Sequence, residues 1–161
     1  MLDLGPAIGA NIAFLGQRTG CKIHVKDLYA DLGEQFAESL DARFADYDAE
    51  SIDAILCWDI FDYLAPGTGD ALARRLIPLL RPGGALLAFF GGSIAGEKTY
   101  TRYVIEDEGH LRYRAAAAPS SRQRILNNRD ILALFPGLTV SDSVLLKSGL
   151  REMLFRKPEE V

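Results

Sequence analysis

Short apolar segments alternate with helical segments along the first 90 residues, and this alternation restricts the folds open to the chain. The apolar segments are residues 2–4, 23–25, 54–58 and 85–90, and helical periodicity falls between them at 8–19, 30–45 and 68–82. The segments AILCW and ALLAFF are apolar throughout, as in strands buried on both faces of a sheet. Repeats of this kind form right-handed crossovers. The sequence therefore predicts a three-layer α/β sandwich around a mostly parallel sheet.

The second half of the chain departs from this alternation. Residues 101–115 predict a hairpin that turns at Glu108-Gly109, followed by a loop at 115–121 and a helix at 128–135. Residues 138–157 predict a closing antiparallel hairpin. We therefore expect a single domain, 1–161, with a cap or hairpin insertion at about 95–122. We expect Thr68 to cap the helix at 68–82 and Gly83-Gly84 to end it. Pro78 is expected to cost this helix one backbone hydrogen bond.

Composition narrows the classes of protein. The 161 residues are 48% hydrophobic, enough for one well-buried core. Cys21 and Cys57 are too few and too far apart for a disulfide framework or a CxxC metal site, which favours a reducing, cytoplasmic setting. No segment reaches the ~18 apolar residues of a membrane span. The net charge of −4 does not indicate nucleic-acid binding, although residues 1–63 are acidic and residues 64–161 are basic.

The turn after the first strand carries the main functional signal. In DLGPAIG the small residues Gly5, Ala7 and Gly9 alternate directly behind the strand, where an open α/β sheet binds its ligands. They would let the backbone approach a ligand, or alternatively allow tight packing of helix on strand. Asp27 ends the second strand about 20 residues later, where such folds hold a ribose. Ala7 breaks the phosphate-binding pattern GxGxxG, so a ligand without phosphates fits better.

Order and spacing together resemble the class I S-adenosylmethionine-dependent methyltransferases, which have a Rossmann-like fold. DLGPAIG is similar to the first motif of that family, and Asp27 falls on its ribose-binding acid. SIDAILCWDIFDYL and LIPLLRPGGALLAFF are similar to the stretches around its fourth and fifth strands. The closing antiparallel hairpin also separates that family from nicotinamide dinucleotide domains.

The resemblance implies a site for S-adenosylmethionine. Asp3 would orient the amino group of the cofactor and Asp27 would bind its ribose. The turn would line the cofactor, and Trp58 with its neighbours Cys57 and Asp59 would flank the sulfonium. The cofactor-binding residues implied in this way are Asp3, Gly5, Pro6, Ala7, Gly9, Asn11, Asp27, Leu28, Asp41, Cys57, Trp58 and Asp59.

Two features depart from the family. The sequence starts on the first strand, whereas the family places one or two helices before it, so we expect either a fragment or a roof from elsewhere, such as residues 95–128 or a second subunit. Only 25 residues separate Asp27 from Asp53, so the third family strand is expected to be missing or vestigial. The adenine-binding acid of the family follows that strand, and Asp41 is the residue that the resemblance implies for it.

Methyl transfer requires alignment of nucleophile, carbon and sulfur more than any one side chain. If a base is needed, Asp59, Asp62 and Tyr63 are the candidates; a loop cap, a helix-start acid and a core aromatic are their structural alternatives. Cys57 has no basic neighbour and is expected to be an inert buried thiol. Neither histidine has a partner at metal-ligand spacing, so no metal is expected.

Tyrosines and arginines gather in the predicted insertion and after it. They could recognise an aromatic or anionic substrate, pack the hairpin itself, or form a homodimer contact; they are Tyr100, Arg102, Tyr103, Arg112, Tyr113, Arg114, Arg122 and Arg124. The sequence thus predicts a methyltransferase acting on a small-molecule or protein acceptor. The alternatives are a non-catalytic cofactor-binding or assembly module and, third, a nicotinamide-dependent oxidoreductase.

Overall fold

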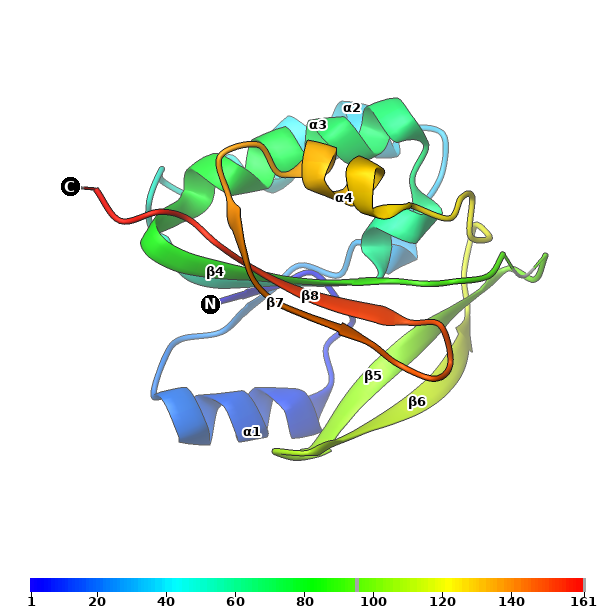
Figure 1. Cartoon of the computed structure of the whole chain (residues 1–161), viewed down its shortest axis with the longest axis horizontal. Coiled ribbons are helices and arrows are strands. Elements are labelled where there is room, and N and C mark those ends of the chain that lie inside the picture. The colour runs from blue at the N-terminus through cyan, green and yellow to red at the C-terminus, as the bar shows by residue number, and fades with distance from the viewer. Residues whose placement is uncertain (95, 161) are drawn as a thin grey trace.

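The computed structural model describes residues 1–94 and 96–160, and its main element is a six-stranded sheet (Figure 1). The strand order is β2-β1-β3-β4-β8-β7. The bounds are β1 (Leu2–Asp3), β2 (His24–Val25), β3 (Ile52–Trp58), β4 (Leu80–Phe90), β7 (Thr139–Leu145) and β8 (Arg151–Arg156). The first four strands are parallel, and β8 runs antiparallel to both β4 and β7. The predicted α/β fold with a closing antiparallel hairpin is confirmed.

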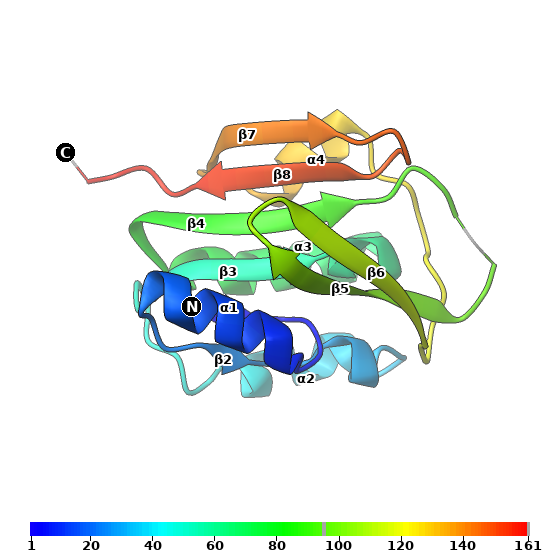
Figure 2. The ribbon, with the colours of Figure 1, turned by 90° about the horizontal axis from the view of Figure 1, so that it is seen from below.

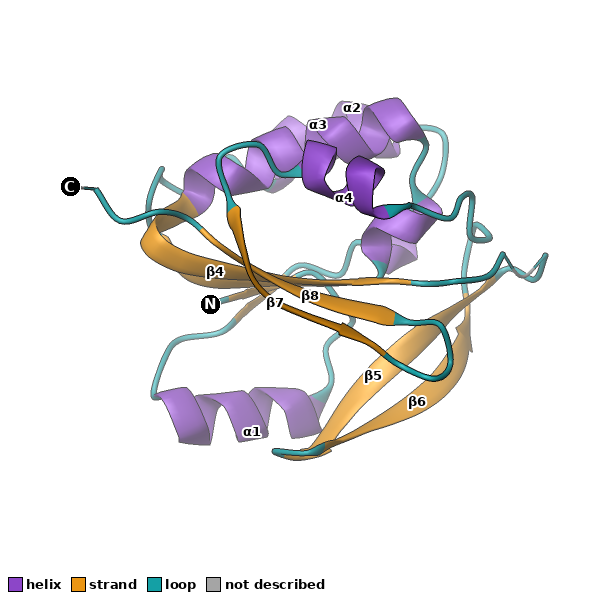
Figure 3. Ribbon diagram, in the orientation of Figure 1, coloured by secondary structure: helices purple, strands orange, loops and turns teal. Residues whose placement is uncertain are grey.

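Helices cover both faces of this sheet, as Figures 1 and 3 show. On one face lie α2 (Phe36–Arg43), α3 (Pro66–Leu76) and α4 (Asn128–Leu134). On the other face lie α1 (Gly9–Thr19) and a separate two-stranded hairpin of β5 (Thr99–Asp107) and β6 (His110–Ala117). Figure 2 shows this hairpin crossing β3 and β4 beside α1. No helix in the described part of the chain is long and apolar enough to cross a membrane.

The segment between β2 and β3 contains no strand. It forms a 3₁₀ turn, η1 (Tyr29–Asp31), and the eight-residue α2, which is shorter than the helix expected over 30–45. Phe36 and Leu40 of α2 are buried in the core. The sheet therefore ends at β2, which agrees with the expectation that the third family strand is missing.

The helix expected at 68–82 has different ends. It begins at Pro66, which fits the first helical position because its missing N–H needs no partner there. Thr68 therefore lies inside α3 and does not cap it. Pro78 falls in a 3₁₀ turn, η3 (Ile77–Leu79), and β4 starts directly after it at Leu80. Proline thus ends the helix, and Gly83-Gly84 lie within the strand.

Both predicted hairpins are present. The strands β5 and β6 pair from Thr99↔Ala117 to Asp107↔His110, so the turn lies at Glu108-Gly109 as expected. The loop predicted at 115–121 starts later, because β6 continues to Ala117. Residue 95, the first of the predicted insertion, lies outside the described residues.

Candidate functional site

The predicted turn begins with a buried contact between β1 and β3. Asp3 is 2% exposed, and its Oδ1 accepts hydrogen bonds from the Gly5 amide at 2.9 Å and the Trp58 indole Nε1 at 2.8 Å. A Cβ on Gly5 would come within 2.8 Å of the Trp58 ring. Glycine is therefore needed at position 5 for packing against this chain's own tryptophan.

Trp58 itself has an unusual backbone. It ends β3 with φ at +50°, a left-handed conformation that costs a bulky residue about 1–3 kcal/mol. This turn aims the indole at Asp3 and stacks it on Tyr103 of β5, with ring centroids 5.4 Å apart and planes within 6°. A strained backbone conformation persists only where surrounding contacts stabilise it. Here the hydrogen bond to Asp3 and the stacking on Tyr103 stabilise the conformation of Trp58.

The second half of the turn is open. Gly9 is exposed, and a Cβ there would meet no atom within 4 Å. Ala7 is exposed and Pro6 half-buried. Helix α1 starts here without a side-chain cap and without an acid in its first turn, so its first amides lack a side-chain partner. Polar ligand atoms can therefore reach the backbone at this end of α1.

Asn11, predicted to bind the cofactor, instead connects α1 to the hairpin. Its side chain donates to the carbonyl of Tyr103 at 2.8 Å and accepts from the amide of Ile105 at 2.7 Å. The side chain is buried and both of its polar ends have partners. It thus fixes β5 against the start of α1.

Asp27 lies at the end of β2, next to the end of β1. Its Oδ1 accepts from the amides of Tyr29 at 3.0 Å and Ala30 at 3.3 Å, which caps the turn that follows. Burial raises the pKa of Asp3, and the nearby charge of Asp27 raises it further. Asp3 and Asp27 therefore lie near the ends of two adjacent parallel strands.

Aromatic side chains lie over this region. Tyr29 is buried and stacks on Tyr100 of β5, with centroids 4.8 Å apart. The backbone amide of Tyr29 donates to Asp27, so Tyr100 lies over the residue next to this carboxylate; burial and the charge of Asp27 both raise the pKa of Tyr100. Leu28, which lies between Asp27 and Tyr29 in the sequence, is fully buried. The hairpin thus covers the end of the sheet where a nucleoside is expected.

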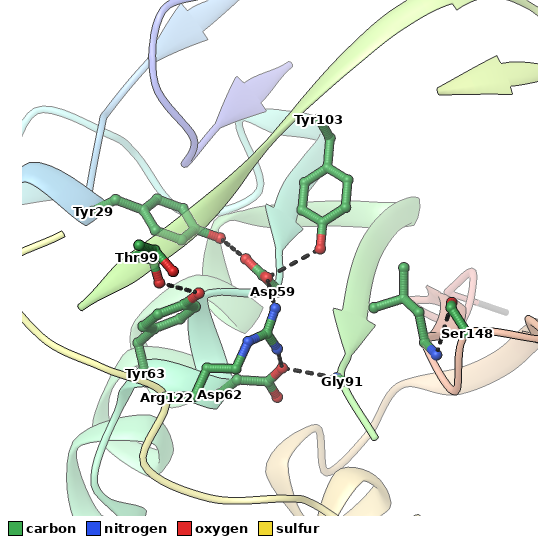
Figure 4. A network of polar contacts seen from close by, with 10 residues as sticks. Tyr29, Asp59, Asp62, Tyr63, Gly91, Thr99, Tyr103, Arg122 and Ser148 are labelled. Atoms are coloured by element: carbon green, nitrogen blue, oxygen red, sulfur yellow. Dashed lines mark hydrogen bonds and ion pairs between the residues drawn. The ribbon is translucent and has the colours of Figure 1, made fainter. Parts of the chain in front are cut away.

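A polar network follows β3 (Figure 4). Asp59 is fully buried, and its oxygens accept from the hydroxyl of Tyr29 at 2.6 Å, the hydroxyl of Tyr103 at 3.0 Å and Arg122 Nη2 at 2.7 Å. Both oxygens of Asp59 are engaged. Its role in this structure is to join the end of β3 to the turn η1, to the hairpin and to the segment after the hairpin.

Asp62 shares the Arg122 guanidinium but is only partly satisfied. Its Oδ2 accepts from Arg122 and from the Gly91 amide at 2.8 Å, while its Oδ1 is buried without a hydrogen-bond partner. Burial raises the pKa of this carboxyl to about 7, against the lowering effects of Gly91 and Arg122. A carboxyl that titrates near neutrality with a free oxygen has the properties of a proton acceptor.

The remaining predicted residues lie in different surroundings. Tyr63 donates its hydroxyl to the carbonyl of Thr99 at 2.9 Å, and burial raises its pKa. Cys57 is fully buried, and this burial raises the pKa of its thiol. Asp41 is apart from the others: its side chain is 96% exposed on α2, 3.6 Å from Arg75 of α3.

Sequence reasoning missed Tyr29 and the connections to Asp59. Tyr29 directly follows Asp27 and Leu28 at the end of β2, and this position was the signal that could have identified it. Tyr103 and Arg122 were recognised as part of a tyrosine and arginine group. Their contact with Asp59 joins residues 44 and 63 positions apart, which no local pattern indicates.

Comparisons with known proteins bear on the fold. No protein-family model matches the sequence, and no curated protein matches it significantly. A crystal structure of 1,6-didemethyltoxoflavin-N1-methyltransferase from Burkholderia thailandensis, with 1,6-didemethyltoxoflavin and S-adenosylhomocysteine bound, matches with a TM-score of 0.60 at 20% identity, over 98% of this chain and 70% of that one.

Two further solved structures agree. An S-adenosylmethionine-dependent methyltransferase from Mesorhizobium loti matches with a TM-score of 0.60 at 12% identity, over 96% of this chain and 89% of that one. The methyltransferase CcbJ from Streptomyces caelestis matches with a TM-score of 0.57 at 14% identity, over 97% and 87%. The resemblance found in the sequence is confirmed at the level of the fold. This chain has the Rossmann-like fold of the class I S-adenosylmethionine-dependent methyltransferases.

Proposed function

We propose that this protein binds S-adenosylmethionine at the ends of β1, β2 and β3 and transfers its methyl group to a small-molecule or protein acceptor. The observation that carries the proposal is the pairing of Asp3 and Asp27 at the ends of adjacent parallel strands, beside the open start of α1. Two neighbouring carboxylates suit a ligand that carries ammonium and sulfonium charges and ribose hydroxyls.

The residues present fit such a ligand in a definite way. Gly9 leaves space for it, and the first amides of α1 offer hydrogen-bond donors. Asp27 uses Oδ1 for its own turn, which leaves Oδ2 for a ribose hydroxyl. Tyr100 stacks on Tyr29, whose amide binds Asp27, so the hairpin lies beside the position proposed for the ribose.

The bound cofactor supplies an electrophilic methyl group, and the protein supplies alignment and a dry site. Trp58 stacks between the turn and the hairpin, where it excludes water. If the acceptor must lose a proton, Asp62 has an oxygen without a hydrogen-bond partner and Asp59 has none, but this oxygen is buried and would first have to become accessible to the acceptor. Arg122 holds both carboxylates in position.

Calorimetry with S-adenosylhomocysteine tests the proposal. Asp27→Ala should weaken binding at least about tenfold, the loss expected when charged hydrogen bonds to ribose disappear. Because alanine also removes the cap on Tyr29 and Ala30, Asp27→Asn serves as a matched variant that keeps an oxygen for these amides. Asp46→Ala, on an exposed residue, is the control. Unchanged affinity in both Asp27 variants would refute the assignment.

One observation favours the non-catalytic alternative. Both oxygens of Asp59 are engaged, and tyrosines of the hairpin lie over the end of the sheet. A cofactor-binding module would bind S-adenosylhomocysteine. It would not convert S-adenosylmethionine to S-adenosylhomocysteine in the presence of any acceptor. Mass spectrometry of the ligand that copurifies with the protein, followed by turnover assays with acceptors suggested by it, separates the two functions.

A further inference from the structure

The hairpin of β5 and β6 has two chemically different faces. One face carries Tyr103, which packs on Trp58 and Phe89. The other carries arginines: Arg102 stands opposite Arg114 in the register, and Arg112 stands opposite Val104. Between this second face and the start of α1 lies a cavity of about 570 Å³, which we call the arginine groove. Arg102, Val104, Arg112 and Arg114, all on the second face, supply most of the hairpin's lining of the groove.

The charges in the arginine groove are mostly of one sign. Arg112 pairs with Glu106, whereas Arg102 and Arg114 make no ion pair with any described residue. Like charges directly opposite each other destabilise a pair of strands. The first turn of α1, which lines the groove at Ile8 and Ala10, adds the positive end of a helix with no acid to offset it. The stability of the hairpin therefore does not explain this pair of arginines.

The lining also defines what can bind. Two arginines at opposite positions of paired strands offer guanidinium donors for the oxygens of a carboxylate or a phosphate. Ile8 and Val104 add apolar wall beside them. The volume falls within the range of small-molecule sites, roughly 300–1,000 Å³, and the net charge of −4 disfavours a polyanion such as a nucleic acid. We propose that the arginine groove binds a small ligand that carries a carboxylate or phosphate on an apolar body.

Binding of simple anions tests this site. Phenylacetate and phenyl phosphate are the probes, phenylacetamide is the neutral match, and calorimetry at constant ionic strength is the measurement. The wild type should bind at least one anion saturably and the amide not at all. Phenylacetate alone would identify a carboxylate site, and phenyl phosphate alone a phosphate site.

Paired variants locate the binding. Arg102→Gln/Arg114→Gln should weaken anion binding at least about tenfold and, because it removes a like-charge pair, should unfold no earlier than the wild type. Arg74→Gln/Arg129→Gln removes two charges from α3 and α4 on the opposite face and should bind as the wild type does. Equal binding by both double variants, or no saturable binding of either anion to the wild type, would overturn the proposal. The groove shares the start of α1 with the proposed cofactor site, but the outcome of this test does not depend on the cofactor, because S-adenosylhomocysteine is absent from every arm.

Discussion

Gly5 and Gly9 illustrate how two similar residues of one motif take different roles. A side chain at position 5 would collide with Trp58, whereas position 9 faces open space. We predict that Gly5→Ala lowers the free energy of unfolding by about 1–3 kcal/mol, the usual cost of overpacking.

Gly9→Ala is the matched control, because alanine at the exposed start of a helix changes stability by no more than ~1 kcal/mol. Urea unfolding of both variants measures the difference. Equal losses would mean that the Trp58 ring can move aside at no cost.

Asp62 predicts a dependence of stability on pH. Its pKa is about 7 in the folded protein and 3.8 when unperturbed. Between these values the folded state binds the proton more strongly than the unfolded state, so the contribution of Asp62 to stability falls as the pH rises from 3.8 to about 7.

In Asp62→Asn the side chain cannot ionise, so the variant lacks the dependence of stability on pH that Asp62 contributes. Its free energy of unfolding relative to that of the wild type should therefore rise from pH 4.5 to about 7, by up to ~1.4 kcal/mol per pH unit, and level off above. Thermal unfolding across this range measures the difference. A constant difference at all pH values would show that the carboxyl does not titrate there.

At the scale of the element, side-chain hydrogen bonds of Asn11, Tyr63 and Asp59 attach the hairpin to the rest of the fold. The bond to Asp59 comes from the hydroxyl of Tyr103. Tyr103→Phe keeps the stacking on Trp58 but removes this charged hydrogen bond, so the amides of β5 and β6 should exchange with solvent at least about tenfold faster.

Amides of β3 and β4 provide an internal reference for this experiment, and Tyr113→Phe, on a half-exposed ring of β6, provides the control variant. If exchange in the hairpin is the same in both variants, the bond to Asp59 does not control its opening.

Elements were predictable where their signals are local. The alternation of apolar and helical segments predicted the parallel strands and their crossovers, and Glu108-Gly109 predicted the hairpin turn. The ends of α3 were not predicted, because Pro66 and Thr68 both suit a helix start and only packing decides between them. The reason for Gly5 was also missed, because the ring that lies against it comes from position 58.

At the scale of the molecule, the acidic first part and the basic second part of the chain meet inside the fold. Five ion pairs among the described residues join an acid from residues 1–63 to a base from residues 64–161. Those of Arg122 with Asp59 and Asp62 are buried, whereas the exposed ones contribute little. The charge asymmetry of the sequence therefore serves, in part, to hold the two parts together.

Trp58 is the only tryptophan in the chain, and it lies between Asp3, Gly5 and Tyr103. The tryptophan fluorescence of the protein therefore originates at one known, buried position. A ligand that enters beside Asp3 should change that emission, whereas an anion on the far face of β5 is separated from the indole by the strand. The protein thus carries a built-in optical reporter that can tell occupancy of one site from occupancy of the other.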